Sequence, residues 1–233
     1  MMLGRRLGLR SRLVSWCILL LSPCLLCAAG TNDWLIVPGK RVGPITSRTT
    51  RADLIHLFGA KEVEDDYVPG GGDADPRPGT WVNRDHAEES LALQWNDDGP
   101  EPHISIIAVC PNDTGEETTG SCRWHTLEGI SLGTSLKTLE KLNGRMFKLL
   151  GMDWDYGGLV TSWGGGQLER ITAKCGELSL QLDEPPGQPS DERAELLDEL
   201  SGDKEFSSSH AAMQRLNPQV STMSVSFEKC GKP

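Results

Sequence analysis

The chain has 233 residues, with 23 lysines and arginines against 33 aspartates and glutamates, which gives a formal net charge of −10. A surface this negative repels nucleic acid and anionic lipid, so the composition argues against nucleic-acid binding. The length suffices for one large domain or for two small units that share a core.

The segment 1–29 has the composition of a signal peptide. Four arginines within residues 5–12 precede an apolar segment at 13–26, and small residues follow up to Ala29. This order predicts export, with cleavage after Ala29 and a periplasmic or extracellular location, although the export route stays open. The apolar segment is shorter than the ~20 residues of a membrane-spanning helix, so we expect no integral membrane segment in the mature chain. Lipid attachment at Cys24 or Cys27 is the less favoured alternative.

Two segments of the mature chain resemble each other at a constant offset. Residues 42–59 align without a gap to residues 127–144, so that Ile45 meets Ile130, Leu54 meets Leu139 and Gly59 meets Gly144. Such self-similarity indicates a duplicated structural unit. We therefore predict a first repeat over residues 30–122 and a second over residues 123–233.

The first repeat begins with a short helix. Thr49 or Thr50 supplies the cap, Asp53 stands at capping-box distance from Thr50, and Gly59 ends the helix. Leu54, Leu57 and Phe58 form its apolar stripe. Alternating apolar residues then predict strands at 80–83, 89–95 and 103–109, and the glycines and prolines of residues 69–79 predict a loop.

The second repeat follows the same order but carries an insertion. Thr134 or Ser135 caps a helix whose stripe is Leu136, Leu139 and Leu142. Strands are expected at 159–163, 177–182 and 220–227, with a hairpin through residues 164–166 into a further strand at 167–172. The insertion at 183–218 contains two predicted helices, 191–200 and 209–216, joined by a polar, mobile link at 203–208.

Four cysteines remain after export, and an even number in an exported protein favours disulfides. Cys110 and Cys122 flank a short polar segment and are predicted to pair. If Leu178 lies opposite Phe227 in an antiparallel pair of strands, Cys175 lies opposite Cys230, which predicts the second disulfide. Free buried thiols are the alternative.

Taken together, these elements predict an α+β fold in which two tandem helix-plus-antiparallel-sheet repeats share a sheet, with the helices on one face. The helix introduced by residues 129–135 and closed by Asn143-Gly144, present twice and followed by strands, resembles the tandem-repeat fold of β-lactamase inhibitor proteins. The motif at 130–134, with Leu139 and Gly144, is also similar to the small lipoproteins of the outer-membrane assembly machine. The resemblance implies an exported protein that binds without catalysis, through an open sheet face. It assigns no functional residue.

The densest group of interesting side chains is Asp153-Trp154-Asp155-Tyr156, followed by two glycines. The two carboxylates could form an acid/base pair or a cation site, and the aromatic rings could stack on a sugar or a protein. A turn into a strand is the favoured interpretation, because one short segment supplies too few converging ligands. Trp163, beside the glycines at 164–166, is with Trp154 the better candidate for an exposed tryptophan.

No metal site, cofactor or catalytic residue is predicted. The five histidines show no paired metal spacing, and the chain has neither a nucleophile-elbow serine nor a phosphate-binding glycine loop.

The leading hypothesis is therefore an exported, non-enzymatic binding protein that recognises another envelope or secreted protein. It would do so through its sheet face or through hairpins near Asp153, Trp154, Asp155, Tyr156 and Trp163. One alternative is a periplasmic hydrolase or carbohydrate-active enzyme that uses Asp153 and Asp155, with a second acid from Glu192 or Glu195. Another is a structural envelope component without a discrete site. The sequence leaves the oligomeric state open.

Overall fold

A computed structural model describes Met1 and residues 32–70, 74–96, 103–111, 122–172, 178–187 and 190–227. The predicted signal peptide lies outside the described residues. The described part is an α+β structure with five helices and three sheets, in which all strand pairs but one are antiparallel. Within it, no helix is both long enough and apolar enough to cross a membrane.

The elements alternate along the chain. The helices are α1 (Arg51–Phe58), α2 (Leu136–Asn143), α3 (Glu169–Thr172), α4 (Asp191–Leu200) and α5 (Ala211–Leu216). The strands are β1 (Leu35–Val37), β2 (Arg41–Val42), β3 (Val63–Val68), β4 (Arg77–Val82), β5 (Leu91–Asn96), β6 (His103–Val109), β7 (His125–Thr126), β8 (Lys148–Leu150), β9 (Val160–Ser162), β10 (Leu178–Asp183), β11 (Glu205–Ser207) and β12 (Gln219–Ser226).

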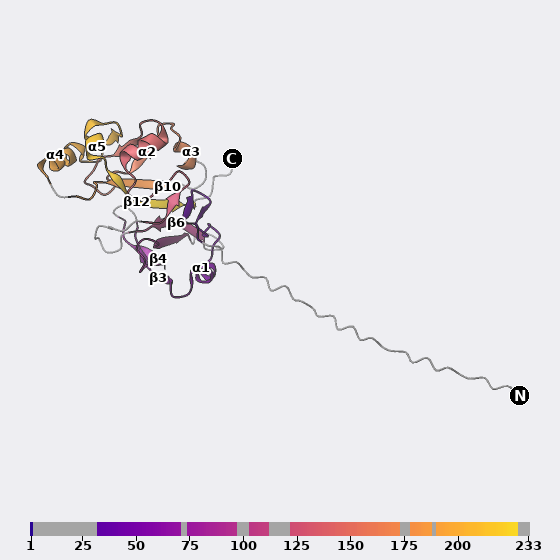
Figure 1. Cartoon of the computed structure of the whole chain (residues 1–233). Helices are drawn as coiled ribbons and strands as arrows, with labels where there is room; N and C mark the ends of the chain where they lie inside the picture. Colours follow the sequence, from indigo (N-terminus) through magenta and orange to yellow (C-terminus); the bar gives the residue numbers. More distant parts are fainter. Residues whose placement is uncertain are drawn as a thin grey trace.

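The largest sheet has the strand order β10-β12-β6-β5-β4-β3. Strand β6 pairs antiparallel with β12, and this pairing crosses the predicted boundary at residue 122. Figure 1 shows α2, α4 and α5 at one end of the molecule, beyond β10, and α1 near β3 at the other end. The sheet therefore contains strands from both halves of the chain.

Two smaller sheets complete the architecture. In the sheet β2-β1-β7, the parallel pairing of β1 with β7 places the start of the described chain beside residues 125–126. In the sheet β11-β8-β9, the strands have only three residues each. Strand β11 lies in the link at 203–208 that was expected to be polar and mobile. That expectation is wrong, because Phe206 is buried and the strand pairs with β8.

Helix α1 begins with the predicted capping box. The Thr50 hydroxyl accepts from the Asp53 amide at 3.2 Å, and the Asp53 carboxylate accepts from the Thr50 amide at 2.9 Å. The cap of α2 is Ser135, and Gly144 ends that helix in the left-handed conformation. The predicted stripe of α1 is only partly correct, because Leu54 is buried whereas Leu57 is 41% exposed.

The segments before α1 and α2 repeat the same hydrogen bonds at positions that the alignment of 42–59 with 127–144 pairs. The Thr46 amide donates to the Thr49 hydroxyl at 2.9 Å, and the Ser131 amide donates to the Thr134 hydroxyl at 3.0 Å. The amides of Thr49 and Thr134 each return a bond of 3.1 Å to the carbonyls of Thr46 and Ser131. The two aligned segments thus form the same turn before their helices.

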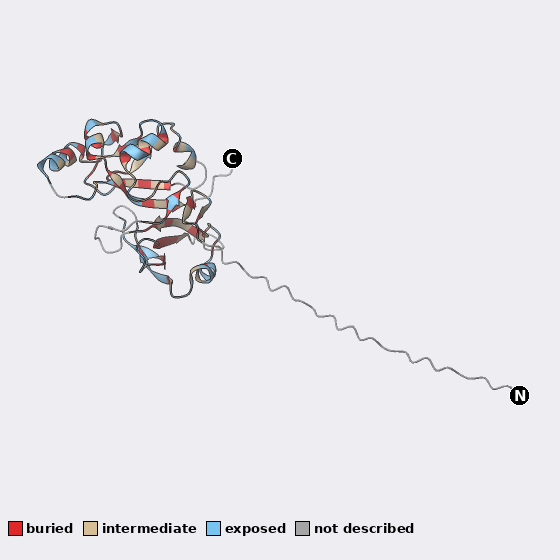
Figure 2. Ribbon diagram, viewed as in Figure 1, coloured by how far each residue is buried: buried red, intermediate tan, exposed pale blue. Residues whose placement is uncertain are grey.

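One continuous core lies on one face of the large sheet, the core face. Leu54 of α1, Leu139 of α2, Leu200 of α4 and Met213 of α5 belong to the same buried cluster as the core-face residues of the strands. These strand residues are Val82, Leu91, Leu93, Ile107, Val109, Leu178, Leu180, Met223 and Val225. Figure 2 shows buried residues along the sheet and exposed residues on the outer sides of the helices.

Strands β10 and β12 pair antiparallel as predicted, but the predicted register is wrong. Leu178 lies opposite Val225 rather than Phe227, and Leu180 lies opposite Met223. The shift is by two residues. It keeps the same side of each strand against the core, because Val225, in β12, and Phe227, directly after it, lie on the same face. Cys175 and Cys230 lie outside the described residues.

Residues 167–172 do not form the predicted strand. Glu169–Thr172 is the short helix α3 instead. The Leu168 amide donates to the Asn143 side chain at 3.1 Å, and the Gln167 amide donates to the Asn143 carbonyl at 2.8 Å. These bonds direct the chain towards the end of α2, away from a hairpin with β9.

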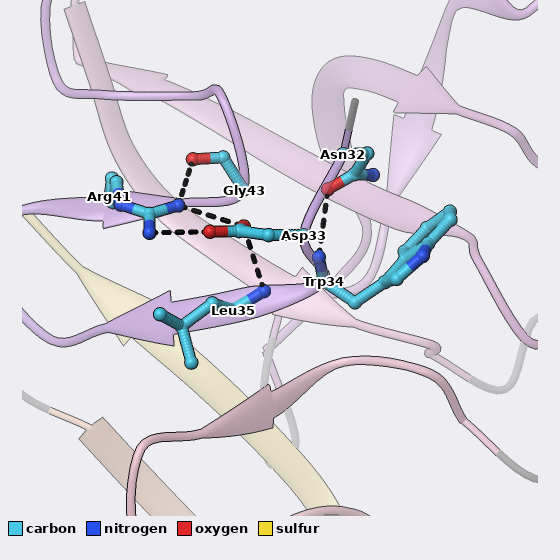
Figure 3. Close-up of polar contacts among 6 residues, drawn as sticks. All are labelled: Asn32, Asp33, Trp34, Leu35, Arg41 and Gly43. Atoms are coloured by element: carbon cyan, nitrogen blue, oxygen red, sulfur yellow. Dashed lines mark hydrogen bonds and ion pairs between the residues drawn. The ribbon is translucent and has the colours of Figure 1, made fainter. Parts of the chain in front are cut away.

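An ion pair holds Asp33, just before β1, against β2. The Arg41 guanidinium donates two hydrogen bonds to the Asp33 carboxylate, at 2.9 and 2.6 Å, and a third to the Gly43 carbonyl at 2.8 Å (Figure 3). The bonds from Arg41 lower the pKa of the Asp33 carboxyl to about 2, from its ordinary value of 3.8. Next to it, Trp34 packs edge-on against the buried Trp124, with ring centroids 5.0 Å apart.

The predicted Cys110–Cys122 disulfide is present, with a Cα–Cα distance of 6.1 Å. It joins the end of β6 to the segment that leads into β7. Because β6 is in the large sheet and β7 pairs with β1, the bond links the large sheet to the sheet β2-β1-β7.

Removal of this disulfide should lower the melting temperature. A loop of this length contributes about 3 kcal/mol by the chain-entropy relation, which corresponds to roughly 6–12 °C in a chain of this size. Calorimetry of the Cys110→Ser, Cys122→Ser double variant measures the change. An unchanged melting temperature would show that the bond does not constrain the unfolded chain.

The Asp33–Arg41 pair should make stability depend on acid pH. The folded-state pKa of Asp33 is depressed, so its contribution is present above pH ~4 and is lost as the pH falls towards 2. The pair is partly exposed, so we expect Asp33→Asn to lower the melting temperature by only about 1–3 °C at pH 7. The difference should shrink between pH 4 and pH 2. Asp203→Asn, which removes an exposed carboxylate elsewhere, is the matched control, and an equal effect of both would contradict the assignment.

Candidate functional site

The turn at residues 153–158 connects β8 to β9. The Gly158 amide donates to the Gly151 carbonyl at 3.0 Å, and the Gly157 amide donates to the Trp154 carbonyl at 2.7 Å. Asp153 has a φ of 62°, in the left-handed region. The favoured interpretation of this segment as a turn agrees with these contacts.

Gly158 fixes the turn against the large sheet. Its φ is 70°, and the Leu182 amide of β10 donates to its carbonyl at 3.0 Å. A β-carbon at this position would lie only 1.7 Å from the Leu182 carbonyl oxygen. Glycine is therefore the residue that lets the turn approach the backbone of β10.

The two aromatic side chains of the turn lie in contact. The rings of Trp154 and Tyr156 have centroids 5.7 Å apart in an edge-to-face arrangement. The Trp154 indole N–H donates to the Gly151 carbonyl at 3.1 Å, which fixes the half-buried ring. Tyr156 is 45% exposed and rests on it. The turn thus presents a fixed aromatic side chain to solvent, as an interface anchor would.

The two carboxylates of the turn do not converge on a pocket. Asp153 and Asp155 are both exposed, and the Gln181 amide of β10 lies 3.5 Å from the Asp155 carbonyl oxygen rather than from its carboxylate. Glu192, a candidate second acid, is ion-paired with Arg215 at 2.6 Å. Within the described ranges, no group of three or more His, Cys, Asp and Glu side chains could hold a metal ion.

Trp163, one of the two better candidates for an exposed tryptophan, is buried. Its side chain is 5% exposed and packs against Phe147, with ring centroids 5.1 Å apart. The side-chain amide of Asn143 donates to the Trp163 carbonyl at 2.9 Å. Trp163 therefore belongs to the buried core and is not part of the exposed surface of the turn.

Strands β6, β12 and β10 form the part of the large sheet that lies beside the turn. We call the side of these strands that points away from the core the open face. Its residues on β6, β12 and β10 are Ile106, Ala108, Thr222, Ser224, Ser226, Ser179 and Gln181. Thr222 is exposed and the others are half-buried. On β4 and β5 the same side of the sheet is covered, since Trp81 and Ala92 are buried with Val68.

The open face is continuous across the three strands. Ala108 lies opposite Ser224, and Ser224 lies opposite Ser179. Thr222 lies opposite Gln181, whose amide reaches the Asp155 carbonyl of the turn. Small side chains thus lead across the sheet to the turn that carries Tyr156.

A cleft between α2 and α5 is the feature that the sequence-based predictions missed. It has a volume of about 380 Å³ and is lined by Lys137, Glu140, Lys141, Gly144, Arg145 and Gln214, a set we call the cationic cleft. Lys137 and Lys141 stand one helical turn apart on one helix face, which is a sequence signal. Gln214, on the opposite wall, comes from the insertion, and its position beside α2 could not be predicted from the spacing of residues in the sequence.

The turn should depend on Gly158 for its folding. We expect Gly158→Ala to lower the free energy of unfolding by more than about 3 kcal/mol, because strain and a backbone clash combine. Gly129→Ala is the matched control, since Gly129 has a φ of 81° but an added β-carbon there would meet no atom within 4 Å. Its cost should be about 1 kcal/mol. Urea unfolding measures both, and equal costs would contradict the contact with β10.

No known protein family, curated protein or solved structure matches this chain. The comparisons therefore add no relative whose ligand or partner could be considered. The turn, the open face and the cationic cleft are interpreted from their own geometry.

Proposed function

We propose that the chain is an exported binding protein that recognises another exported protein through the open face and the adjoining turn. The observation that carries this proposal is the row of mostly small side chains on β6, β12 and β10, which leads to Gln181, whose side-chain amide reaches the Asp155 carbonyl of the turn that carries the exposed Tyr156.

The composition of the two sheet faces supports the proposal. The core face carries Leu, Ile, Val and Met, whereas the open face carries mainly Ala, Ser, Thr and Gln. Short side chains on strands leave a shallow surface on which another protein can lie closely, and their hydroxyl groups can hydrogen-bond to it. An aromatic anchor at the edge of such a surface supplies apolar contact area.

The chemistry of the turn also favours binding over hydrolysis. A hydrolase needs two carboxyl groups held across a bound substrate. Asp153 and Asp155 are exposed on a turn, and neither lines the cationic cleft. No observation on the described residues favours the enzymatic alternative.

Export is a further part of the proposal. The basic and apolar pattern of the segment 1–29, together with a cysteine pair at disulfide distance, supports passage into an oxidising compartment. The predicted second disulfide, Cys175 with Cys230, would suit the same compartment.

Capture of partners from the exported protein fraction of the source cells tests the proposal. Tyr156→Ala should weaken capture about 5- to 30-fold, as expected when an interface aromatic is truncated. Thr222→Arg should weaken it by placing a long charged side chain on the open face. Retention of a captured partner is measured by quantitative mass spectrometry.

Tyr67→Ala is the matched control. Tyr67 is 61% exposed but lies on β3, at the opposite edge of the sheet. It should leave capture unchanged. Recovery of no partner, or of a partner that Tyr156→Ala and Thr222→Arg do not weaken, would overturn the proposal.

A further inference from the structure

We propose that the cationic cleft is a second binding site, which receives an acidic peptide segment of a partner protein. The inference goes beyond the open-face proposal, because the cleft is formed by α2 and α5 and shares no residue with the open face or the turn.

The charges of the cleft are unbalanced. Lys137, Lys141 and Arg145 line it, and none of them has an ion-pair partner among the residues that the structure describes. The cleft has one carboxylate, that of Glu140, which accepts a hydrogen bond from the side-chain amide of Gln214 at 3.0 Å. The cleft therefore carries a net positive charge in a chain whose net charge is −10.

Helix stability does not account for Lys137. This residue is in the first turn of α2, directly after Ser135 and Leu136, and that turn contains no acidic residue. The helix dipole makes a cation unfavourable there. In α1 the first turn instead carries Asp53, which favours the helix. Lys137 therefore needs another explanation, which an anionic ligand provides.

The cleft belongs to the second half of the chain only. When the alignment of the two repeats is continued past Gly59 and Gly144, the three cleft cations Lys137, Lys141 and Arg145 correspond to Ala52, His56 and Ala60. The segment around α1 therefore has no lysine or arginine at these positions. The opposite wall comes from α5, which lies in the insertion. Its Gln214 amide also donates to the Ser208 carbonyl at 2.8 Å, which fixes the wall.

An exposed apolar side chain beside the cleft favours a peptide over a free anion. Met146 directly follows Arg145 and is 57% exposed. Its sulfur accepts hydrogen bonds from the hydroxyls of Ser207 and Ser209, on either side of Ser208. Met146 thus contacts the segment 207–209, whose Ser208 carbonyl is bonded to Gln214. Flexible methionines suit apolar side chains of varied shape, so an acidic segment with an apolar residue would use both features.

Fluorescence anisotropy with the purified protein tests the inference. The probe is a labelled peptide of glutamates around a central leucine, at about 20 mM salt, where exposed charges are weakly screened. We expect saturable binding that weakens as salt is added. Lys141→Gln with Arg145→Gln should weaken it about tenfold or more, because two charge-assisted contacts are lost.

Arg48→Gln with Lys61→Gln is the matched control, since both residues have no ion pair among the described residues and lie outside the cleft. This double variant removes the same charge and should change the affinity less than about twofold. An equal loss in both double variants would overturn the inference, as would failure of the wild type to bind. Inorganic phosphate that competes as tightly as the peptide would show a site for small anions only, which also overturns it.

Lys137→Glu provides a separate readout. The acidic side chain should raise the melting temperature by about 1–3 °C, through the helix dipole, while the affinity for the probe falls. A merely structural lysine would show no loss of affinity. These outcomes do not depend on Tyr156 or Thr222, so failure of the open-face proposal is distinguishable from failure of this one.

Discussion

The pairing of β12 with β6 is the constraint on which the rest of the structure depends. Strand β12 is the last strand of the described chain, yet it lies inside the sheet between β6 and β10. The Gly133 amide donates to the Val220 carbonyl, and the Leu136 amide donates to the Pro218 carbonyl, so the start of α2 is also held by this segment. The open face exists only when β12 is in place, because Thr222 and Ser224 are its central residues. The large sheet, the start of α2 and the proposed interface therefore all depend on β12.

Local contacts explain which parts of the fold could be predicted from the sequence. The caps at Thr50 and Ser135 depend on side chains that bond to amides within the same helical turn, so the sequence contains the whole interaction. The register of β10 against β12 depends on contacts between distant segments. Alternation shows only which face a residue occupies, and opposing Leu178 to Val225 or to Phe227 keeps the same face. The alternating pattern therefore predicted the strand at 177–182 but could not distinguish the two registers.

The candidate site shows the same limit. The turn around Asp153 was predicted because its glycines and acidic residues are local signals. The burial of Trp163 was not, because it depends on Phe147 and Asn143, which meet it only after β8 and β9 pair. Strands β8, β9 and β11 have three residues each, too few for an alternating pattern to be recognised. To predict the cationic cleft, one must know that α5 lies beside α2. The periodicity of apolar residues in the sequence does not give this position.

The hydrogen bonds that recur at aligned positions of segments 42–59 and 127–144 separate two kinds of residue. The paired positions, such as Thr49 with Thr134 and Leu54 with Leu139, form turns and core, where the physical requirement is the same in both halves. The positions aligned with the cleft cations differ and are exposed, and Ala52 aligns with Lys137 at a place where the helix dipole disfavours a cation. A lysine that opposes the stability of α2, next to a wall that the insertion supplies, is accounted for by the proposed peptide site rather than by folding.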